Sequence, residues 1–109
     1  LEVPMSDAVH DKIRQDIEQN PIVLFMKGSK SFPQCGFSAQ VLTLLAKYKV
    51  AFETRNVLED EALRQGIKEF SSWPTVPQLY VRGKFVGGSD IVTDLDQKGE
   101  LEALLKGTK

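Results

Sequence analysis

Residues 22–38 read Ile-Val-Leu-Phe-Met-Lys-Gly-Ser-Lys-Ser-Phe-Pro-Gln-Cys-Gly-Phe-Ser, and this stretch decides the fold. The five apolar residues that open it favour a parallel strand, because parallel strands are usually covered on both faces of a sheet. A polar loop follows and is closed by Pro33, and a helix is expected to begin near Cys35. This strand–loop–helix unit places a thiol at the opening of a helix.

Apolar periodicity on both sides of this unit predicts further helices and strands. An upstream helix would bury Val9, Ile13 and Ile17 on one face and be capped by Ser6 or Asp7. The other expected elements are a strand over 22–26, a helix from about 35 to 48, a strand over 51–57, a helix over 59–70, strands over 78–81 and 84–86 joined by a two-residue turn, and a last helical region that begins at Ser89 or Asp90 and is interrupted by Gly99. This αβαβαββα order predicts an α/β fold with parallel and antiparallel pairing in one sheet.

Length and composition restrict the function classes. A chain of 109 residues predicts one domain, which we expect over residues 7–109, with residues 1–6 as a leader remnant or an added segment. The net charge of -1 argues against a nucleic-acid partner, and the longest apolar run is too short to span a membrane. A single cysteine excludes an internal disulfide and indicates a reducing compartment, and a single histidine excludes a multi-histidine metal site within one chain.

Cys35 is the strongest candidate for chemistry. Unpaired N–H groups and the positive end of the helix dipole favour an anion at a helix start, so the pKa of this thiol should fall. The dipole accounts for about one pKa unit at most, and Lys27 is the cation that could lower the pKa further. The alternative is a small buried apolar side chain. Ser38, three residues on, cannot resolve a mixed disulfide and can only form hydrogen bonds.

Two further motifs allow both a functional and a structural interpretation. The main chain of Val76, in Thr75-Val76-Pro77, could pair with a passing peptide; alternatively Pro77 is a trans proline at a strand start, and the pattern leaves cis or trans open. The glycine pair before Ser89 and Asp90 would let a ligand approach the backbone, with Asp90 facing an ammonium group. The alternative there is an ordinary helix cap after a turn.

Trp73 and His10 lie outside these motifs. Trp73 is expected either to pack beside the turn at Pro74 or to lie at a partner surface. His10 is expected on the solvent side of the first helix.

The chain resembles the monothiol glutaredoxins with a Cys-Gly-Phe-Ser site. The resemblance covers about residues 7–106 and is carried by Lys27-Gly28, by residues 33–38, by Leu63-Arg64-Gln65, by residues 73–78 and by residues 87–91. It implies the thioredoxin/glutaredoxin fold, with a four-stranded mixed sheet flanked by helices, and it implies that Pro77 is cis. Ser89 stands where many members have a second cysteine, so a regulatory disulfide with Cys35 is not expected.

The resemblance also implies a glutathione site with Cys35 at its centre. Lys27 and Arg64 would hold the glycine carboxylate, Val76 would pair with the cysteinyl backbone, and Ser89 and Asp90 would bind the γ-glutamyl end. Phe37 is counted among the same cofactor-binding residues. Cys35 would be both the catalytic thiol and the metal ligand.

Members of this family typically bind a 2Fe–2S cluster between two subunits. Such a cluster generally needs four ligands, and two chains with one cysteine each supply two, so two glutathione thiolates would complete the set. We therefore expect a monomer without cluster, a homodimer with it, and as partners glutathione, BolA-type proteins and apo iron–sulfur acceptors.

Two other functions stay open at this point. A glutathione-dependent thiol–disulfide oxidoreductase of weak activity is the alternative, and a redox-inert adaptor is the third possibility. The compartment would be the cytoplasm in a bacterium, or the mitochondrial matrix or plastid stroma after precursor processing.

Overall fold

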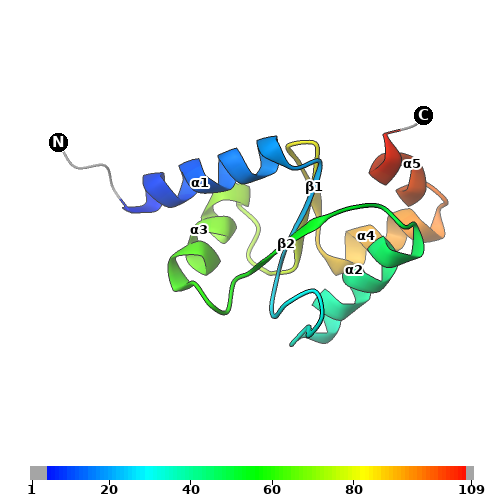
Figure 1. Ribbon diagram of the computed structural model, residues 1–109, viewed down its shortest axis with the longest axis horizontal. Coiled ribbons are helices and arrows are strands. Elements are labelled where there is room, and N and C mark those ends of the chain that lie inside the picture. Colours follow the sequence, from blue (N-terminus) through cyan, green and yellow to red (C-terminus); the bar gives the residue numbers. More distant parts are fainter. Residues whose placement is uncertain (1–4, 108–109) are drawn as a thin grey trace.

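One mixed four-stranded sheet forms the centre of the molecule in the computed structural model, which describes residues 5–107 (Figure 1). The strand order is β2-β1-β3-β4; β1 is parallel to β2 and antiparallel to β3, and β3 is antiparallel to β4. The elements are α1 (Met5–Gln19), β1 (Ile22–Met26), α2 (Gly36–Lys47), β2 (Glu53–Asn56), α3 (Glu61–Ser71), β3 (Gln78–Val81), β4 (Lys84–Gly87), α4 (Ser89–Gln97) and α5 (Leu101–Lys106). The mixed sheet flanked by helices confirms the predicted fold.

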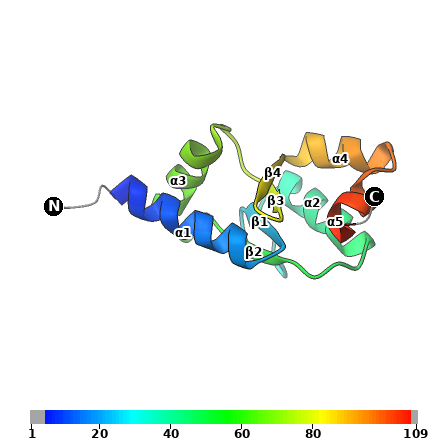
Figure 2. The same cartoon turned by 90° about the horizontal axis from the view of Figure 1, so that it is seen from above.

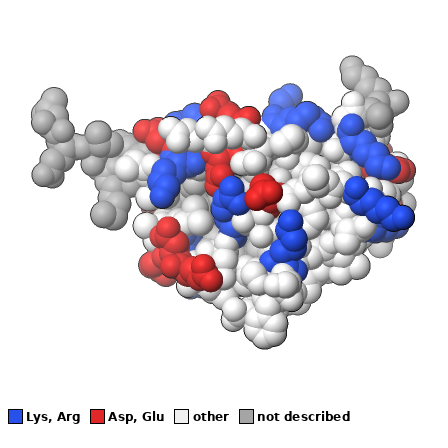
Figure 3. All heavy atoms as spheres, in the orientation of Figure 1, with Lys and Arg blue, Asp and Glu red and all other residues white. Residues whose placement is uncertain are grey.

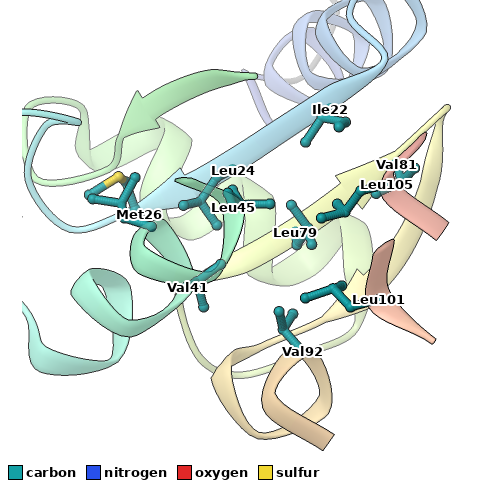
Figure 4. Packing of buried hydrophobic residues seen from close by; sticks show 11 residues of the cluster. Ile22, Leu24, Met26, Val41, Leu45, Leu79, Val81, Val92, Leu101 and Leu105 are labelled. Atoms are coloured by element: carbon teal, nitrogen blue, oxygen red, sulfur yellow. The ribbon is translucent and has the colours of Figure 1, made fainter. Parts of the chain in front are cut away.

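Two helical layers cover the two faces of the sheet. Figure 2 shows α1 and α3 on one side and α2, α4 and α5 on the other. Successive side chains of β1 point to opposite faces, so Leu24 packs toward α2 while Phe25 packs toward α1 and α3. Figure 4 shows the cluster of buried residues on the α2 side of the sheet, which includes Leu45, Leu79, Val92 and Leu101. The strand buried on both faces is the one that the all-apolar run predicts.

Several predicted boundaries shift for identifiable physical reasons. The helix predicted from 59 begins at Glu61, because the Asp60 side chain caps it by accepting from the backbone N–H of Leu63 at 3.0 Å. The last helical region divides into α4 and α5, as expected at Gly99. The cap of α4 is Gly88 rather than Ser89 or Asp90, since the Ser89 hydroxyl donates to the Gln40 side chain instead.

The remaining elements follow their patterns closely. Val76–Pro77 is a cis peptide, as the resemblance implies. Arg82 and Gly83 both have positive φ, 49° and 80°, which suits the two-residue turn between β3 and β4. The strand predicted over 51–57 is shorter, Glu53–Asn56. Helix α1 begins at Met5; the side chains of Ser6 and Asp7, the predicted caps, lie outside the described residues.

The prediction that His10 faces solvent is wrong. Its side chain is 24% exposed, and its Nε2 lies 3.5 Å from a carboxylate oxygen of Glu69 on α3. The ring also meets the edge of Phe70, with centroids 5.9 Å apart. The apolar face of α1 is therefore broader than the spacing of Val9, Ile13 and Ile17 indicates.

Candidate functional site

A groove of about 480 Å³ opens where the loops that follow β1, α3 and β4 meet. Four segments line it: Lys27 after β1, the start of α2 with Cys35 and Phe37, the end of α3 with residues 73–77, and residues 88–91 at the start of α4. These segments are distant in sequence, and the sheet order brings them together. Of the predicted site residues, Arg64 alone does not line the groove.

Cys35 occupies the N-cap position of α2. Its backbone is extended, with φ −147° and ψ 133°, its thiol makes no capping hydrogen bond, and it is half-buried. Partial burial raises the pKa of this thiol, but the backbone N–H groups of Ser38 and Phe37, the Ser38 hydroxyl and the positive charge of Lys27 outweigh it, and the pKa is lowered. The helix start therefore favours the thiolate more than Lys27 does, and the interpretation of Cys35 as a fully buried apolar side chain is wrong.

Ser38 links the two ends of the unit that carries the thiol. It is fully buried, and its hydroxyl accepts from the backbone N–H of Lys27 at 3.2 Å. The end of β1 and the first turn of α2 are thereby held together on either side of Cys35. The serine is a structural anchor that also favours the thiolate.

The loop between β1 and α2 is closed at its base by further hydrogen bonds. The backbone N–H of Gln34 donates to the carbonyl of Lys27 at 2.9 Å, and the backbone N–H of Gly28 donates to the Asn56 side chain at 2.9 Å. Gly28 has a φ of +97°, and a Cβ there would lie 2.6 Å from the backbone nitrogen of Gln34, so only glycine fits. At the other side, Lys30 Nζ donates to the Phe52 carbonyl at 2.8 Å and lies over its ring.

Val76 presents main chain rather than side chain to the groove. Its side chain is buried in the cluster under α1 and α3, while the residue lines the groove. Within residues 5–107, neither its N–H nor its carbonyl forms a hydrogen bond. A free main-chain edge is what pairing with an extended peptide requires.

Ser89 and Asp90 form the opposite wall at the first turn of α4. The Ser89 hydroxyl donates to Gln40 Oε1 at 3.1 Å, and Gln40 Nε2 donates to Thr93 at 2.9 Å. Ser89 is therefore directed toward α2 and can offer a ligand its backbone N–H, whereas Asp90 is exposed and can meet an ammonium group with its carboxylate.

Lys68 is the functional candidate that sequence reasoning missed. It lies one helical turn after Arg64 on α3, and it lines the groove where Arg64 does not. Neither Lys27 nor Lys68 pairs with a carboxylate within the part of the chain that is described. Two ammonium groups without a carboxylate partner among the described residues therefore line the groove that contains the thiol. The spacing of four residues on one helix was the signal that could have identified Lys68.

Exposed apolar side chains border the groove and the loop before it. Phe32 is 71% exposed, Phe37 is 61% exposed and Trp73 is 39% exposed. Trp73 lines the groove and packs on Phe85, and its place at a partner surface stays a prediction. Figure 3 shows that acidic side chains gather over the start of α3, while the lower edge of that face, below them, is uncharged. No helix within residues 5–107 is long and apolar enough to cross a membrane.

Replacing Ser38 with alanine should raise the pKa of the Cys35 thiol, because it removes a hydroxyl that favours the thiolate. It also leaves the Lys27 N–H without an acceptor, at a cost of about 1–3 kcal/mol in stability. The measurement is the pH dependence of iodoacetamide alkylation, whose midpoint should move to higher pH. Lys27→Gln should move it in the same direction but less, and a larger shift for Lys27→Gln would contradict this ranking.

Comparison with known proteins identifies relatives of this chain. A family model described as Glutaredoxin matches residues 22–86. The Synechocystis protein named uncharacterized monothiol glutaredoxin ycf64-like is 50% identical over 102 residues, covering 94% of this chain and 95% of that protein. The Arabidopsis thaliana protein named monothiol glutaredoxin-S15, mitochondrial, is 44% identical over 101 residues, covering 93% of this chain and 60% of that protein. The solution structure of reduced poplar apo GrxS14 has a TM-score of 0.83 at 45% identity and covers 96% of each chain.

Proposed function

Because the chain belongs to the glutaredoxin family, among its monothiol members, we propose that it carries a 2Fe–2S cluster ligated by glutathione and delivers it to apo-proteins. The cluster is cargo: it is assembled between two copies of the chain and handed on. The observation that carries the proposal is the single thiol at the start of α2, half-buried in an open groove and with its pKa lowered.

The residues of the groove fit such a cargo. Cys35 is the only thiol in the sequence, and no group of three or more His, Cys, Asp or Glu residues in the described chain is arranged so that it could hold a metal ion. A 2Fe–2S cluster generally takes four thiolate or histidine ligands, so two chains leave two positions for external thiols. A thiolate is the form that binds metal, and the lowered pKa supplies it near neutral pH.

Glutathione is the proposed external thiol because its charges match those of the groove. Its glycine carboxylate would meet Lys27 and Lys68, with Arg64 contributing from one turn earlier in α3. Its cysteinyl backbone would pair with Val76, and its γ-glutamyl ammonium would meet Asp90. Two further contacts are proposed for the glutathione site. The Ser89 backbone N–H would donate to the γ-glutamyl carboxylate, and the Phe37 ring would lie beside the thiols.

The exposed apolar residues around the groove suit a protein partner. Phe37 and Trp73 would be covered in a homodimer when the cluster is bound, and the chain would be a monomer without it. A BolA-type protein could take the place of one copy, and apo iron–sulfur proteins would receive the cluster. The mitochondrial name of the Arabidopsis relative supports an organellar compartment, and the Synechocystis relative supports the cytoplasm of a bacterium.

Anaerobic reconstitution with iron, sulfide and glutathione tests this proposal. The expected product is a coloured dimer whose native mass contains two chains, one 2Fe–2S cluster and two glutathiones. Omitting glutathione, or replacing it with a thiol of similar pKa that has no peptide group, should prevent assembly. A colourless monomer in the presence of glutathione would overturn the homodimer carrier.

Glutathione-dependent reduction of mixed disulfides is the second candidate, and the half-buried thiol with its lowered pKa, which lines an open groove, favours it. The Cys35 thiolate would attack the glutathione sulfur of a protein–glutathione disulfide and release the protein thiolate. Free glutathione would then attack the Cys35–glutathione disulfide and leave as glutathione disulfide. Turnover coupled to glutathione reductase distinguishes the two functions, since fast turnover without cluster would favour the reductase.

Lys68→Gln should weaken glutathione binding more than Arg64→Gln does. A charge-assisted hydrogen bond to a carboxylate typically contributes 1.5–3 kcal/mol, so the equilibrium constant for forming the Cys35–glutathione disulfide should fall about tenfold for Lys68→Gln. Arg64 lies outside the groove, and its replacement should change this constant less than about threefold. Mass spectrometry over a series of glutathione redox buffers measures both. Equal losses would contradict this ranking and would mean that Arg64 contributes as much to binding as Lys68 does.

A further inference from the structure

Gln78 carries a buried polar side chain that the glutathione site, as described above, does not use. It is fully buried, on the face of β3 that packs against α1 and α3, where its neighbours include Phe25 and Tyr80. A buried amide in an apolar layer is costly unless its hydrogen bonds are satisfied. A glutamine at this position therefore indicates a role for its hydrogen bonds in addition to packing.

The Gln78 amide holds the loop that forms one wall of the groove. Its Nε2 donates to the carbonyl of Trp73 at 3.2 Å and to the carbonyl of Thr75 at 3.1 Å. Both residues line the groove, and Val76 with its unpaired main chain comes directly after them. Two bonds from one rigid amide therefore fix the backbone on the N-terminal side of Val76.

The orientation of this amide is itself set by a neighbour. The Tyr80 hydroxyl donates to Gln78 Oε1 at 3.2 Å, which leaves the amide nitrogen directed at the loop. Burial raises the pKa of Tyr80 to about 12, so the hydroxyl keeps its proton and acts as a donor throughout the physiological range. Tyr80 packs edge to face on Phe25, with centroids 5.6 Å apart, and this contact restrains the ring.

We propose that Gln78 is a positioning residue for peptide recognition, which holds the Val76 main chain at the place where it pairs with the cysteinyl backbone of glutathione. The inference rests on the proposed glutathione site. It adds two buried residues to that site: Gln78, which fixes the Val76 main chain, and Tyr80, which orients Gln78. Gln78 and Tyr80 strengthen the binding of ligands that carry a peptide group and have no effect on the binding of disulfides that carry none.

The test compares two disulfides in exchange with Cys35. In each reaction the Cys35 thiolate forms a bond to one sulfur, the original disulfide bond breaks, and the other half leaves as a thiolate. Glutathione disulfide can pair with the Val76 main chain, whereas hydroxyethyl disulfide has no peptide group. The variants are Gln78→Met, which keeps the length of the side chain, and Tyr80→Phe, which removes only the hydroxyl.

The equilibrium constant for exchange of Cys35 with glutathione disulfide should fall about tenfold for Gln78→Met and about threefold for Tyr80→Phe. The constant with hydroxyethyl disulfide and the alkylation rate of Cys35 should stay unchanged. Two matched controls should change neither constant: Tyr48→Phe loses a tyrosine hydroxyl bonded to Asp96 far from the groove, and Ile17→Ala weakens the same apolar layer without touching the loop.

Two results would overturn the inference. One is an unchanged constant for glutathione disulfide in both variants; the other is an equal fall for both disulfides, which would mean a structural role only. If Gln78→Met does not fold, Tyr80→Phe decides alone. A wild-type protein that does not prefer glutathione disulfide over hydroxyethyl disulfide would instead refute the glutathione site, and that failure is visible before any variant is made.

Discussion

Replacing Cys35 with serine should abolish cluster assembly and glutathione exchange while leaving the fold at least as stable. The thiol is the only one in the chain, so no other side chain can take over its bond to iron or sulfur. It is half-buried and makes no capping hydrogen bond, so its loss removes no structural contact of that kind. Serine is a favoured N-cap residue, and at this extended backbone position it can cap α2 and add a few tenths of a kcal/mol or more.

The two halves of this prediction are measured separately. Visible absorption and native mass after reconstitution follow the cluster, and thermal unfolding follows the fold. Alanine at the same position should lose the cluster equally but without the gain in stability, because it cannot cap the helix. A coloured, cluster-containing dimer from Cys35→Ser would show that the iron ligands lie elsewhere.

Replacing Gly87 with alanine should cost about 3 kcal/mol in stability and disturb the groove. Gly87 has a φ of +148°, and a Cβ there would lie 2.6 Å from the Cβ of Ile91 and under 3 Å from both of its γ-carbons. Backbone strain and overpacking each cost about 1–3 kcal/mol. Ile91 lines the groove beside Asp90, so relief of the clash must move the first turn of α4.

Gly99→Ala provides the matched control. Gly99 also has positive φ, +73°, but a Cβ there would meet nothing within 4 Å. We expect a loss of about 1 kcal/mol from strain alone, with the affinity for glutathione unchanged. Chemical denaturation gives both free energies of unfolding, and equal losses for the two variants would mean that the contact with Ile91 contributes nothing.

The sequence predicts the parts of the fold that depend on local pattern. The run at 22–26 forms the central strand with those bounds, and the turn at Arg82-Gly83 joins β3 to β4 as its residues indicate. The predicted helix starts are wrong where the hydrogen bond of a polar side chain decides the cap. Asp60 caps α3 later than the apolar pattern begins, and the Ser89 hydroxyl donates to Gln40 on α2 rather than capping α4. The bond of Ser89 depends on Gln40, a neighbour distant in sequence, whereas the Asp60 cap is a local contact that apolar periodicity does not register.

The candidate site shows the same division. Cys35, Lys27 and Asp90 could be identified because a helix start and a glycine pair are local features, and the groove contains all three. Asn56 and Gln78 could not, since the role of each depends on where its side-chain amide points in the fold: Asn56 accepts from the distant Gly28, and Gln78 donates back to the loop before β3. The prediction that His10 faces solvent is wrong because the periodicity of the aliphatic residues in α1 does not show how wide the face covered by α3 is.

The closed base of the loop between β1 and α2 has a consequence for protein engineering. Hydrogen bonds join Lys27 to Gln34 and to Ser38 at the base of the loop. The exposed residues 29–32 lie beyond them, held by the paired main chains of Ser29 and Phe32 and by the bond from Lys30 to the Phe52 carbonyl. Lengthening an exposed segment of this kind costs little, because closure entropy grows only as the logarithm of its length. A short epitope or fluorophore tag spliced in between Ser29 and Phe32 should therefore leave the thiol where it stands, making this tip an attachment point beside a reactive centre.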